Sequence, residues 1–360
     1  MKKRKNSNLS DLRTKIDDID AKILALVSRR GDVARQIGNI KRQSGSAVYV
    51  PSREKQIFDT LTKLNSGPYS DPSIIAIFRE IISATRALEV PTRVAFLGPF
   101  ATFTHMAAVH HFGTSATFLA QTGISEVFVE VEKDHADYGV VPVENSTEGV
   151  VNYTLDKFVE SDLKICSEII ISVAHHLMSA EPEIKRIKRV YSHPQALVQC
   201  RQWLSLNLPG VELKETESTA AAAERVRKEK GAAAIASHLA ADIYGLNILK
   251  ADIQDQIHNF TRFLVISKEV AQPTGRDKTS LVIAAKDRVG ILYELLRPLS
   301  EAGVNLTKIE SRPLKKRAWE YLFFLDLDGH LKDPVVSESL ARLKAESEFF
   351  KVLGSYPRSS

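Results

Sequence analysis

Residues 138–146 read YGVVPVENS, an apolar run that ends in a glutamate, an asparagine and a serine. A short apolar run of this kind is typical of a buried strand, and polar residues follow it where the strand ends. Further short runs alternate with helical segments through residues 93–267, namely 93–97, 189–191, 232–236 and 262–266. Alternating strands and helices predict an α/β domain with a ligand cleft at the strand ends.

Polar clusters adjoin these predicted strands at 98–105 (GPFATFTH), 142–149 (PVENSTEG), 192–195 (SHPQ) and 259–263 (NFTRF). The backbone N–H groups and hydroxyls of such turns suit a carboxylate. Each cluster taken singly is also explained by helix capping, because Ser, Thr and Asn are common at helix starts. A serine hydrolase built on Ser146 or Ser192 is disfavoured, since the chain lacks a G-x-S-x-G motif and the adjacent Ser192 and His193 would point apart.

Residues 9–90 predict three helices, at 9–42, 51–64 and 71–89, with Asp71 as the cap of the third. The first helix carries an apolar seam with alternating spacings of three and four, which is typical of a helix that pairs with another. The seam consists of Leu9, Leu12, Ile16, Ile19, Ile23, Leu26, Val33, Ile37 and Ile40.

Arg30 interrupts this seam, and an arginine in a packed seam is costly unless an anion meets it. Lys41 lies three helical turns further on nearly the same face, so the two cations could hold a small dianion. Arg13 is roughly 25 Å from Arg30 along the helix and can join that site only from an antiparallel second copy. This predicts an intertwined dimer. The alternative is that Arg30 only sets the register of the pairing.

Residues 279–355 predict the order strand, helix, strand, strand, helix, strand, which is the ferredoxin-like plan. The expected elements are 279–285, 289–302, 304–311, 319–327, 334–347 and 349–355. Linkers near 90–92 and 268–278 then divide the chain into expected domains at 1–90, 93–267 and 277–356.

The chain has 360 residues, of which 44% are hydrophobic, as in ordinary packed domains. Its net charge of +5 is local, because residues 1–42 carry twelve Lys or Arg, five Asp and no aromatic residue. Nucleic-acid-binding faces interleave basic and aromatic side chains, so we expect no nucleic-acid partner. Two cysteines exclude a four-cysteine zinc site. The basic start lacks the apolar segment of a signal peptide and no run approaches a membrane span, so we expect a cytoplasmic protein with no membrane partner.

The helical region resembles the all-helical chorismate mutase module, on the pattern Leu12-Arg13-x-x-Ile16-Asp17…Leu26…Arg30…Lys41…Arg53-Glu54…Thr85…Glu89. The resemblance implies that the enzyme rearranges chorismate to prephenate by holding it in its reactive conformation and stabilising the breaking ether bond, without a cofactor. It assigns carboxylate binding to Arg30 and to Arg13 of a second copy, supported by Arg53. It assigns the ether oxygen to Lys41 and Glu89, the ring hydroxyl to Glu54, and a further substrate contact to Thr85.

Two residues of the mutase pattern depart from many relatives. Val50 stands where Asp is common, which weakens the contact to the ring hydroxyl. Glu89 stands where Gln is common, and a carboxyl group donates a hydrogen bond only when it is protonated. We therefore expect mutase activity to fall as the pH rises.

The polar clusters, taken together in this order, resemble prephenate dehydratase, most strongly in 138–146 and in Thr261-Arg262-Phe263. The resemblance implies two α/β lobes around a cleft, similar to periplasmic binding proteins, and conversion of prephenate to phenylpyruvate with loss of CO₂ and the ring hydroxyl. Hydroxide is a poor leaving group and needs a proton donor, which the resemblance assigns to Thr261. Arg262 is expected to be a carboxylate-binding or framework cation. The other implied substrate-binding residues are Thr102, Thr104, Glu144, Asn145, Ser146, Ser192, His193, Gln195 and Phe263.

Two positions also depart from the dehydratase pattern. Ala101 replaces a glycine that is frequent in the first turn, and Ile257 departs from a segment that usually contains proline. Either change could shift a turn, and neither removes a group with proposed chemistry.

The C-terminal region resembles the ACT regulatory module, on the segments 287–292 (DRVGIL) and 309–313 (IESRP). The resemblance implies that phenylalanine binds there as an inhibitor, at Gly290, Ile291, Leu292, Asn305, Glu310, Ser311, Arg312 and Pro313. The alternative is that the C-terminal region is a small sheet used only for dimerisation.

The three resemblances together predict a bifunctional enzyme of phenylalanine biosynthesis with no metal or organic cofactor, acting as a homodimer or larger homo-oligomer. A non-catalytic amino-acid sensor is a second possibility, because a two-lobed cleft with an ACT module could bind a ligand without turnover. Thr261 and the set of mutase cations argue against it. A third possibility is the same enzyme with a preference for arogenate.

Overall fold

The computed structural model describes residues 9–44, 51–89, 91–256, 258–285, 288–313 and 321–359, without the side chains of 41–44. Val50, Ile257 and Asp287, and the side chain of Lys41, therefore lie outside the described part. The chain forms two compact units. The first comprises residues 1–50, 58–92 and 112–116, and the second comprises 51–57, 93–111 and 117–360.

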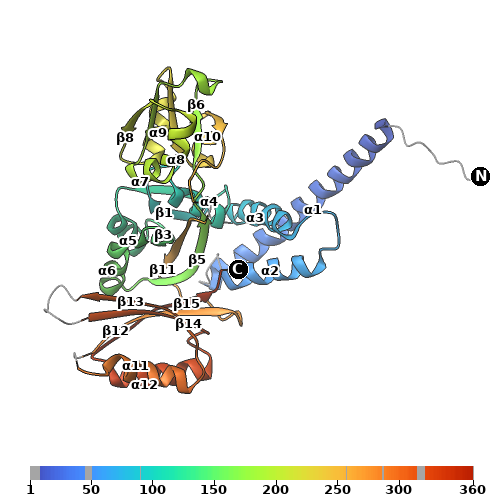
Figure 1. The fold of residues 1–360 in the computed structure, drawn as a ribbon. Helices are drawn as coiled ribbons and strands as arrows, with labels where there is room; N and C mark the ends of the chain where they lie inside the picture. Colours follow the sequence, from blue (N-terminus) through green and yellow to red (C-terminus); the bar gives the residue numbers. More distant parts are fainter. Residues whose placement is uncertain are drawn as a thin grey trace, which may run out of the picture. The chain divides into compact units, whose positions relative to one another are not determined.

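The helical region consists of three helices, α1 (Leu9–Ser44), α2 (Pro51–Leu64) and α3 (Asp71–Ala87), as predicted (Figure 1). The cap of α3 differs from the prediction, because Ser70 and not Asp71 accepts the backbone N–H of Ser73. Asp71 lies inside the first turn, where its charge still favours the helix dipole. The apolar seam of α1 is exposed from end to end, with 62% exposure at Leu9 and 65% at Leu26 and Ile40.

The α/β region consists of two sheets, which form the two expected lobes. The first is ordered β2-β1-β3-β11-β5 with the short β4 beside β3, and the second is ordered β10-β6-β9-β7-β8. Both are mixed, because β11 runs antiparallel to β3 and β6 runs antiparallel to β9. The first-lobe strands are β1 (Arg93–Leu97), β2 (Thr117–Gln121), β3 (Tyr138–Asn145), β4 (Gly149–Val150), β5 (Lys164–Ser172) and β11 (Phe260–Ser267). The second-lobe strands are β6 (His176–Ser179), β7 (Arg189–Ser192), β8 (Glu212–Glu215), β9 (Ala232–Ala236) and β10 (Asn247–Lys250).

Helices cover both sheets, and the chain crosses between the lobes twice. The first lobe carries α4 (Phe103–Phe112), α5 (Ile124–Glu132) and α6 (Asn152–Glu160); the second carries α7 (Pro194–Gln199), α8 (Arg201–Asn207), α9 (Thr219–Val226), α10 (His238–Tyr244) and the short η1 (Ile184–Arg186). Among the described residues, the crossing segments are 173–175 and 251–256 with 258–259. They are joined where Val173 N donates to Asn259 O at 2.8 Å. The paired crossings hold the two lobes at a common edge.

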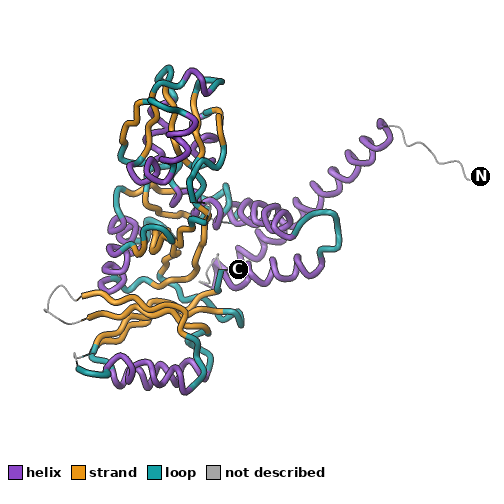
Figure 2. The backbone as a smooth tube through the Cα atoms, viewed as in Figure 1, coloured by secondary structure: helices purple, strands orange, loops and turns teal. Residues whose placement is uncertain are grey.

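The C-terminal region is a four-stranded antiparallel sheet in the order β13-β14-β12-β15. Its strands are β12 (Asp277–Ala284), β13 (Leu306–Pro313), β14 (Tyr321–Asp328) and β15 (Phe349–Pro357). The two helices, α11 (Ile291–Glu301) and α12 (Pro334–Glu346), lie on one face of the sheet (Figures 1 and 2). A core that includes Leu281, Leu295 and Leu340 fills the space between them. The predicted βαββαβ order is confirmed.

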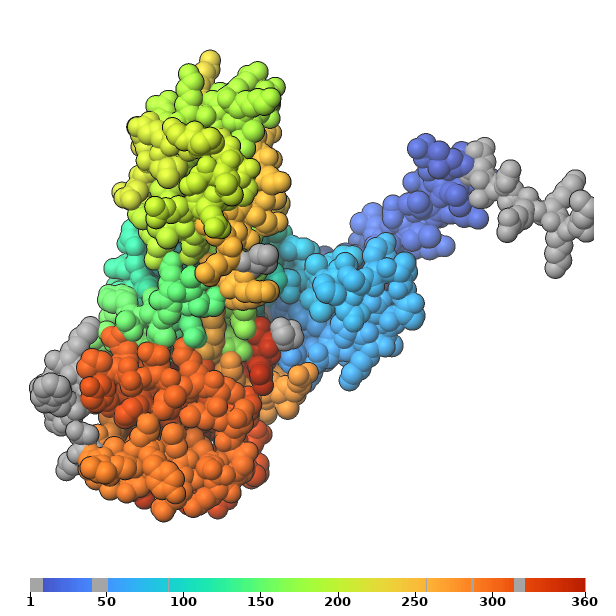
Figure 3. Space-filling model, viewed as in Figure 1, coloured from blue at the N-terminus to red at the C-terminus, as the bar shows by residue number. Residues whose placement is uncertain are grey.

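The other face of this sheet packs against the first lobe, with β15 beside β5 (Figure 1). Figure 3 shows the atoms of the two domains adjoining each other. Gly354 on β15 approaches β5 so closely that an added Cβ would lie 2.2 Å from Ile165 O. Lys164 Nζ donates to Val352 O at 3.0 Å, and Lys351 Nζ donates to Ser161 O at 2.7 Å. The two domains therefore share an interface with close backbone contact.

Candidate functional sites

The helical region brings Arg30 and Thr85 together. Arg30 Nη1 donates to Thr85 Oγ1 at 2.6 Å, and the Thr85 hydroxyl donates to Ile81 O at 2.6 Å. Burial lowers the pKa of Arg30, but an arginine side chain stays charged at neutral pH. Glu89, just beyond α3, packs against α1 at Gly38, where an added Cβ would lie 2.8 Å from its side chain. The Glu89 Oε2 atom is buried and has no hydrogen-bond partner in the described residues.

The other predicted mutase residues lie on α1 and α2. Arg13 is exposed on α1. On α2, Arg53 is exposed and donates to Gln56 Oε1 at 3.4 Å, whereas Glu54 is buried. Because the side chain of Lys41 is not described, the full predicted set remains a prediction.

A cavity of about 320 Å³ lies between the two α/β lobes. Of the predicted residues, it is lined by Thr102, Thr104, Asn145, His193, Gln195 and Thr261. Thr102 and Thr104 belong to the start of α4 in the first lobe, and Ser218 and Thr219 belong to the start of α9 in the second. Helix N-termini present free N–H groups and a positive dipole end, so both lobes offer the cavity an anion-binding element. No Lys or Arg lines it in the described part of the chain.

Asn145 and Thr261 form a fixed pair in this cavity. They lie opposite each other on β3 and β11, and Asn145 Nδ2 donates to Thr261 Oγ1 at 2.8 Å and to Asn259 Oδ1 at 2.9 Å. Asn145 Oδ1 accepts the backbone N–H groups of Thr147 and Glu148 at 2.9 and 3.1 Å. These four bonds fix the carboxamide. Because Thr261 Oγ1 accepts from Asn145, its own proton can be donated to a ligand.

Sequence reasoning missed several cavity residues. Glu148 accepts hydrogen bonds from Gln195 Nε2 at 2.8 Å and Gln199 Nε2 at 3.2 Å, across the two lobes. Gln199 Oε1 contacts His175 Nε2 at 2.8 Å and Asn259 Nδ2 at 3.3 Å. Burial lowers the pKa of His175. Glu148 and Asn259 belong to clusters already noted, and Gln199 is one helical turn after Gln195. His175 lies on a crossing segment, which has no sequence signal.

Five predicted dehydratase residues do not line the cavity. Ser192 is fully buried and donates to Ile235 O at 2.7 Å, and Phe263 is a core residue. Ser146 Oγ accepts the backbone N–H of Phe260 at 2.9 Å, so it holds a loop. Glu144 directly precedes Asn145 on β3, and Arg262 directly follows Thr261 on β11. Successive side chains of a strand point to opposite faces of the sheet. Both therefore point away from this cavity, so their assignment as substrate-binding residues stays a prediction, and for Arg262 the contacts favour the framework alternative.

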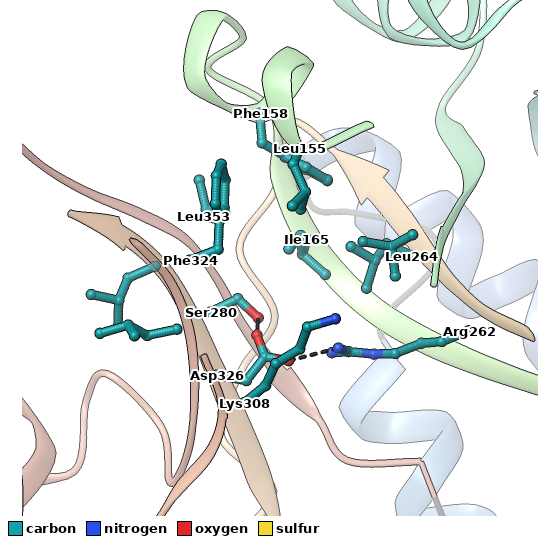
Figure 4. A pocket seen from close by; sticks show the side chains of 13 residues that line it. Leu155, Phe158, Ile165, Arg262, Leu264, Ser280, Lys308, Phe324, Asp326 and Leu353 are labelled. Carbon is teal, nitrogen blue, oxygen red and sulfur yellow. Dashed lines mark hydrogen bonds and ion pairs between the residues drawn. The ribbon is translucent and has the colours of Figure 1, made fainter. Parts of the chain in front are cut away.

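Arg262 is a framework cation between the first lobe and the C-terminal sheet (Figure 4). Its guanidinium donates to Glu168 Oε2 at 2.8 Å, to Asp326 Oδ2 at 2.6 Å and to Tyr356 OH at 2.9 Å. Burial lowers the pKa of Arg262, but Tyr356, Asp326 and Glu168 outweigh it and raise the pKa overall. Ser280 donates to Asp326 Oδ1 at 2.5 Å. Of these groups, Arg262, Ser280 and Asp326 border a small cavity of about 30 Å³. Its apolar lining includes Phe158, Ile165 and Leu353.

The turn at Ala101 has the left-handed backbone conformation that suits the glycine frequent at this position in the dehydratase pattern. Ala101 has φ of 69°, a conformation that glycine reaches more easily. Its N–H donates to His105 Nδ1 at 3.2 Å, which holds the turn in place. Burial lowers the pKa of His105 to about 4, so this imidazole is neutral and can accept that bond.

The predicted effector residues occupy two places in the C-terminal domain. Gly290, with φ of 82°, caps α11, and Ile291 and Leu292 form its first turn. Asn305 directly precedes β13, the edge strand of the sheet, and the remaining residues lie on that strand. Asn305 Nδ2 donates to Asp328 Oδ2 at 2.8 Å, and Arg312 pairs with Asp156 of α6 at 2.8 Å.

Of the helices described, none is long and apolar enough to cross a membrane. The described residues hold no cluster of three metal-ligating side chains.

Comparison with known proteins accounts for all three parts. Residues 12–90 match the chorismate mutase type II family, residues 94–271 match the prephenate dehydratase family and residues 279–345 match the ACT domain family. The bifunctional chorismate mutase/prephenate dehydratase of Aquifex aeolicus (strain VF5) is 51% identical, and that of Stutzerimonas stutzeri is 44% identical, each over 98% of both chains. The structure of prephenate dehydratase in complex with L-Phe from Arthrobacter aurescens is 36% identical with a TM-score of 0.68, covering 74% of this chain and 90% of that one.

These matches define a multidomain enzyme of aromatic amino acid biosynthesis with a C-terminal ACT regulatory domain. The chain belongs to the family of bifunctional chorismate mutase/prephenate dehydratases, and it carries both activities.

Proposed function

We propose that prephenate binds in the cavity between the two α/β lobes and that Thr261 donates the proton to its leaving hydroxyl. The observation that carries this proposal is the fixed pair in which Asn145 donates to Thr261 at 2.8 Å, which leaves the threonine proton for the substrate. Prephenate carries two carboxylates, and the cavity offers the helix starts at Thr102 and Ser218, one from each lobe. Thr104, His193 and Gln195 supply further polar contacts.

A threonine hydroxyl is a weak acid, so the cavity must help it. The dianionic substrate is bound by N–H groups and hydroxyls without a lining Lys or Arg in the described residues. Negative charge is therefore not fully neutralised before reaction, which favours loss of the ring carboxylate as CO₂. The electron pair of the broken C–C bond enters the ring and the C–O bond breaks, so the hydroxyl leaves as water with the proton of Thr261. The resulting alkoxide accepts the hydrogen bond from Asn145 Nδ2 at 2.8 Å and regains a proton from water. The test is the rate of phenylpyruvate formation from prephenate by wild-type protein and Thr261→Val. Parallel reactions with arogenate distinguish the two substrates.

In the helical region, we propose that Arg30 and Arg13 of a second copy hold the carboxylates of chorismate, supported by Arg53. Lys41 and Glu89 then contact the ether oxygen, and Glu54 and Thr85 complete the site. The apolar seam of α1 supports this arrangement, because it is exposed along its length and a second copy would cover it. Sedimentation of the full-length protein tests the assembly as a homodimer or larger homo-oligomer.

We propose that phenylalanine binds the ACT domain and inhibits the dehydratase. The segments concerned are Gly290-Ile291-Leu292 and the strand with Asn305, Glu310, Ser311, Arg312 and Pro313. The contact of Arg312 with Asp156 supports this, because a residue of the effector segment touches the dehydratase domain directly. Titration of dehydratase activity with phenylalanine, beside direct measurement of phenylalanine binding, is the test. A cytoplasmic location stays a prediction.

A further inference from the structure

Two pairs of charged residues face each other across the interface between the first lobe and the ACT domain. Glu144 on β3 lies opposite Arg262 on β11, and Lys308 on β13 lies opposite Asp326 on β14. Lys308 Nζ pairs with Glu144 Oε2 at 2.5 Å, and Asp326 Oδ2 pairs with Arg262 Nη1 at 2.6 Å. The Glu144–Arg262 pair of the first lobe is therefore joined to the Lys308–Asp326 pair of the ACT sheet by two ion pairs. We name these residues the interdomain charge set.

The dehydratase half of this set adjoins the reactive residues directly. Asn145 follows Glu144 on β3, and Thr261 precedes Arg262 on β11. A shift of either strand at the charge set moves the neighbouring side chain in the cavity, because adjacent residues share one backbone segment. Both members of the Asn145–Thr261 pair are thus connected to the ACT sheet through one peptide unit each.

The ACT half of the set adjoins the proposed effector residues. Lys308 lies on β13, two residues before Glu310, and β13 also carries Ser311, Arg312 and Pro313. Residues of the ACT domain itself fix Asp326. Ser280 Oγ donates to Asp326 Oδ1 at 2.5 Å, and the Tyr356 hydroxyl lies 2.6 Å from the same Ser280 Oγ. The Arg262–Asp326 pair is poorly accessible to water, with 13% and 10% of the side chains exposed, whereas Lys308 is 19% and Glu144 is 37% exposed. Water therefore screens the Arg262–Asp326 pair less than surface pairs.

We propose that Lys308 and Asp326 are positioning residues of the dehydratase site, which set the strand positions of Asn145 and Thr261 according to the state of the ACT domain. Binding of phenylalanine along β13 changes the position of Lys308, and the change reaches the cavity through Glu144 and Arg262. Coupling of this kind is reciprocal, so a ligand in the cavity changes the affinity for phenylalanine by the same factor. The inference rests on the proposed inhibition by phenylalanine.

The test compares two matched lysines of the ACT domain in the full-length protein. Lys308→Met removes one member of the charge set. Lys351→Met removes a lysine of similar exposure whose ammonium donates to Val159 O and Ser161 O, away from β3 and β11. For each protein, the measurements are the inhibition of the dehydratase by phenylalanine and the direct binding of phenylalanine by calorimetry, with and without phenylpyruvate in the cavity.

In Lys308→Met, we expect phenylalanine to bind while the ratio of uninhibited to inhibited activity falls about fivefold, the size expected for loss of one partly buried ion pair. The effect of phenylpyruvate on phenylalanine affinity should also fall, and Lys351→Met should behave as the wild type. Unchanged inhibition in Lys308→Met, an equal loss in both variants, or loss of phenylalanine binding itself would overturn the inference. Wild-type protein that phenylalanine does not inhibit would instead overturn the proposed regulation.

A charge exchange gives an independent readout if Lys308→Met does not fold. Lys308→Glu places two carboxylates together and should weaken inhibition further, and adding Glu144→Lys should restore at least half of the wild-type response. A double variant that folds and turns over prephenate but stays insensitive to phenylalanine would contradict the proposal. Asp326→Asn, which keeps the shape of the side chain, should show the same loss of inhibition as Lys308→Met.

Discussion

Replacing Thr261 by valine removes one hydroxyl from the dehydratase cavity and keeps the shape of the side chain. The hydroxyl accepts one hydrogen bond, from Asn145 Nδ2 at 2.8 Å, and Asn145 keeps its second acceptor, Asn259 Oδ1 at 2.9 Å. The stability cost is therefore that of one hydrogen bond, about 1 kcal/mol. The catalytic cost is larger, because a positioned proton donor contributes roughly 10²–10⁴-fold to rate.

We therefore expect Thr261→Val to lower kcat for prephenate about 10³-fold, equivalent to about 4 kcal/mol in the barrier. The KM should change less than about threefold, because the helix starts that bind the carboxylates are untouched. Thr261→Ser keeps a hydroxyl and should stay within about tenfold of the wild type. Chorismate loss in the same preparations provides the control, since the mutase residues lie in the helical region. A Thr261→Val protein with more than about a tenth of wild-type kcat would refute the role of Thr261 as proton donor.

Further predictions concern the other sites. Ile23→Glu should dissociate the oligomer and lower mutase activity at least tenfold while dehydratase activity persists, as sedimentation and both assays would show. Gly290→Trp should weaken phenylalanine inhibition more than Gly290→Ala, which shares the strain at φ of 82°; equal inhibition constants would place the effector elsewhere. Burial lowers the pKa of His105 to about 4, so the unfolding free energy of the protein should fall by no more than about 3 kcal/mol between pH 6.5 and pH 4. Urea titrations of the His105→Gln variant should lack this pH dependence.

The sign of the His105 prediction follows from where its proton binds. Burial lowers the pKa in the folded protein, so the unfolded chain binds the proton first as the pH falls. The stabilisation is fully present above the unfolded pKa of roughly 6.5 and is lost as the pH falls toward about 4.

Local patterns were sufficient to predict much of the fold. The heptad seam predicted α1, and the short apolar runs between helical segments predicted β1, β3, β7, β9 and β11. The missed strands have weaker signals. β8 reads ELKE and is an edge strand, while β5 carries Glu168 within its apolar run because that carboxylate meets Arg262 and Lys278 at the domain interface. Such a pairing depends on residues far apart in the chain, which local patterns do not contain.

The same limit applies to the candidate site. The clusters around Asn145 and Thr261 were found because polar residues at strand ends are a local signal. Which neighbours face the cavity depends on strand alternation and on the domain packed behind the sheet, so Glu144 and Arg262 were assigned to substrate. Both instead contact the ACT sheet. Gln199 and His175 reach the cavity only through tertiary packing, and no motif marks them.

The most direct test is a coupled assay on the purified full-length protein with chorismate as the only substrate. Chorismate loss and phenylpyruvate formation are followed separately, with and without phenylalanine. We expect both signals, with phenylpyruvate formation suppressed by phenylalanine. Chorismate loss without phenylpyruvate, in protein that also fails to turn over added prephenate, would contradict the placement of prephenate dehydration in the two-lobed cavity.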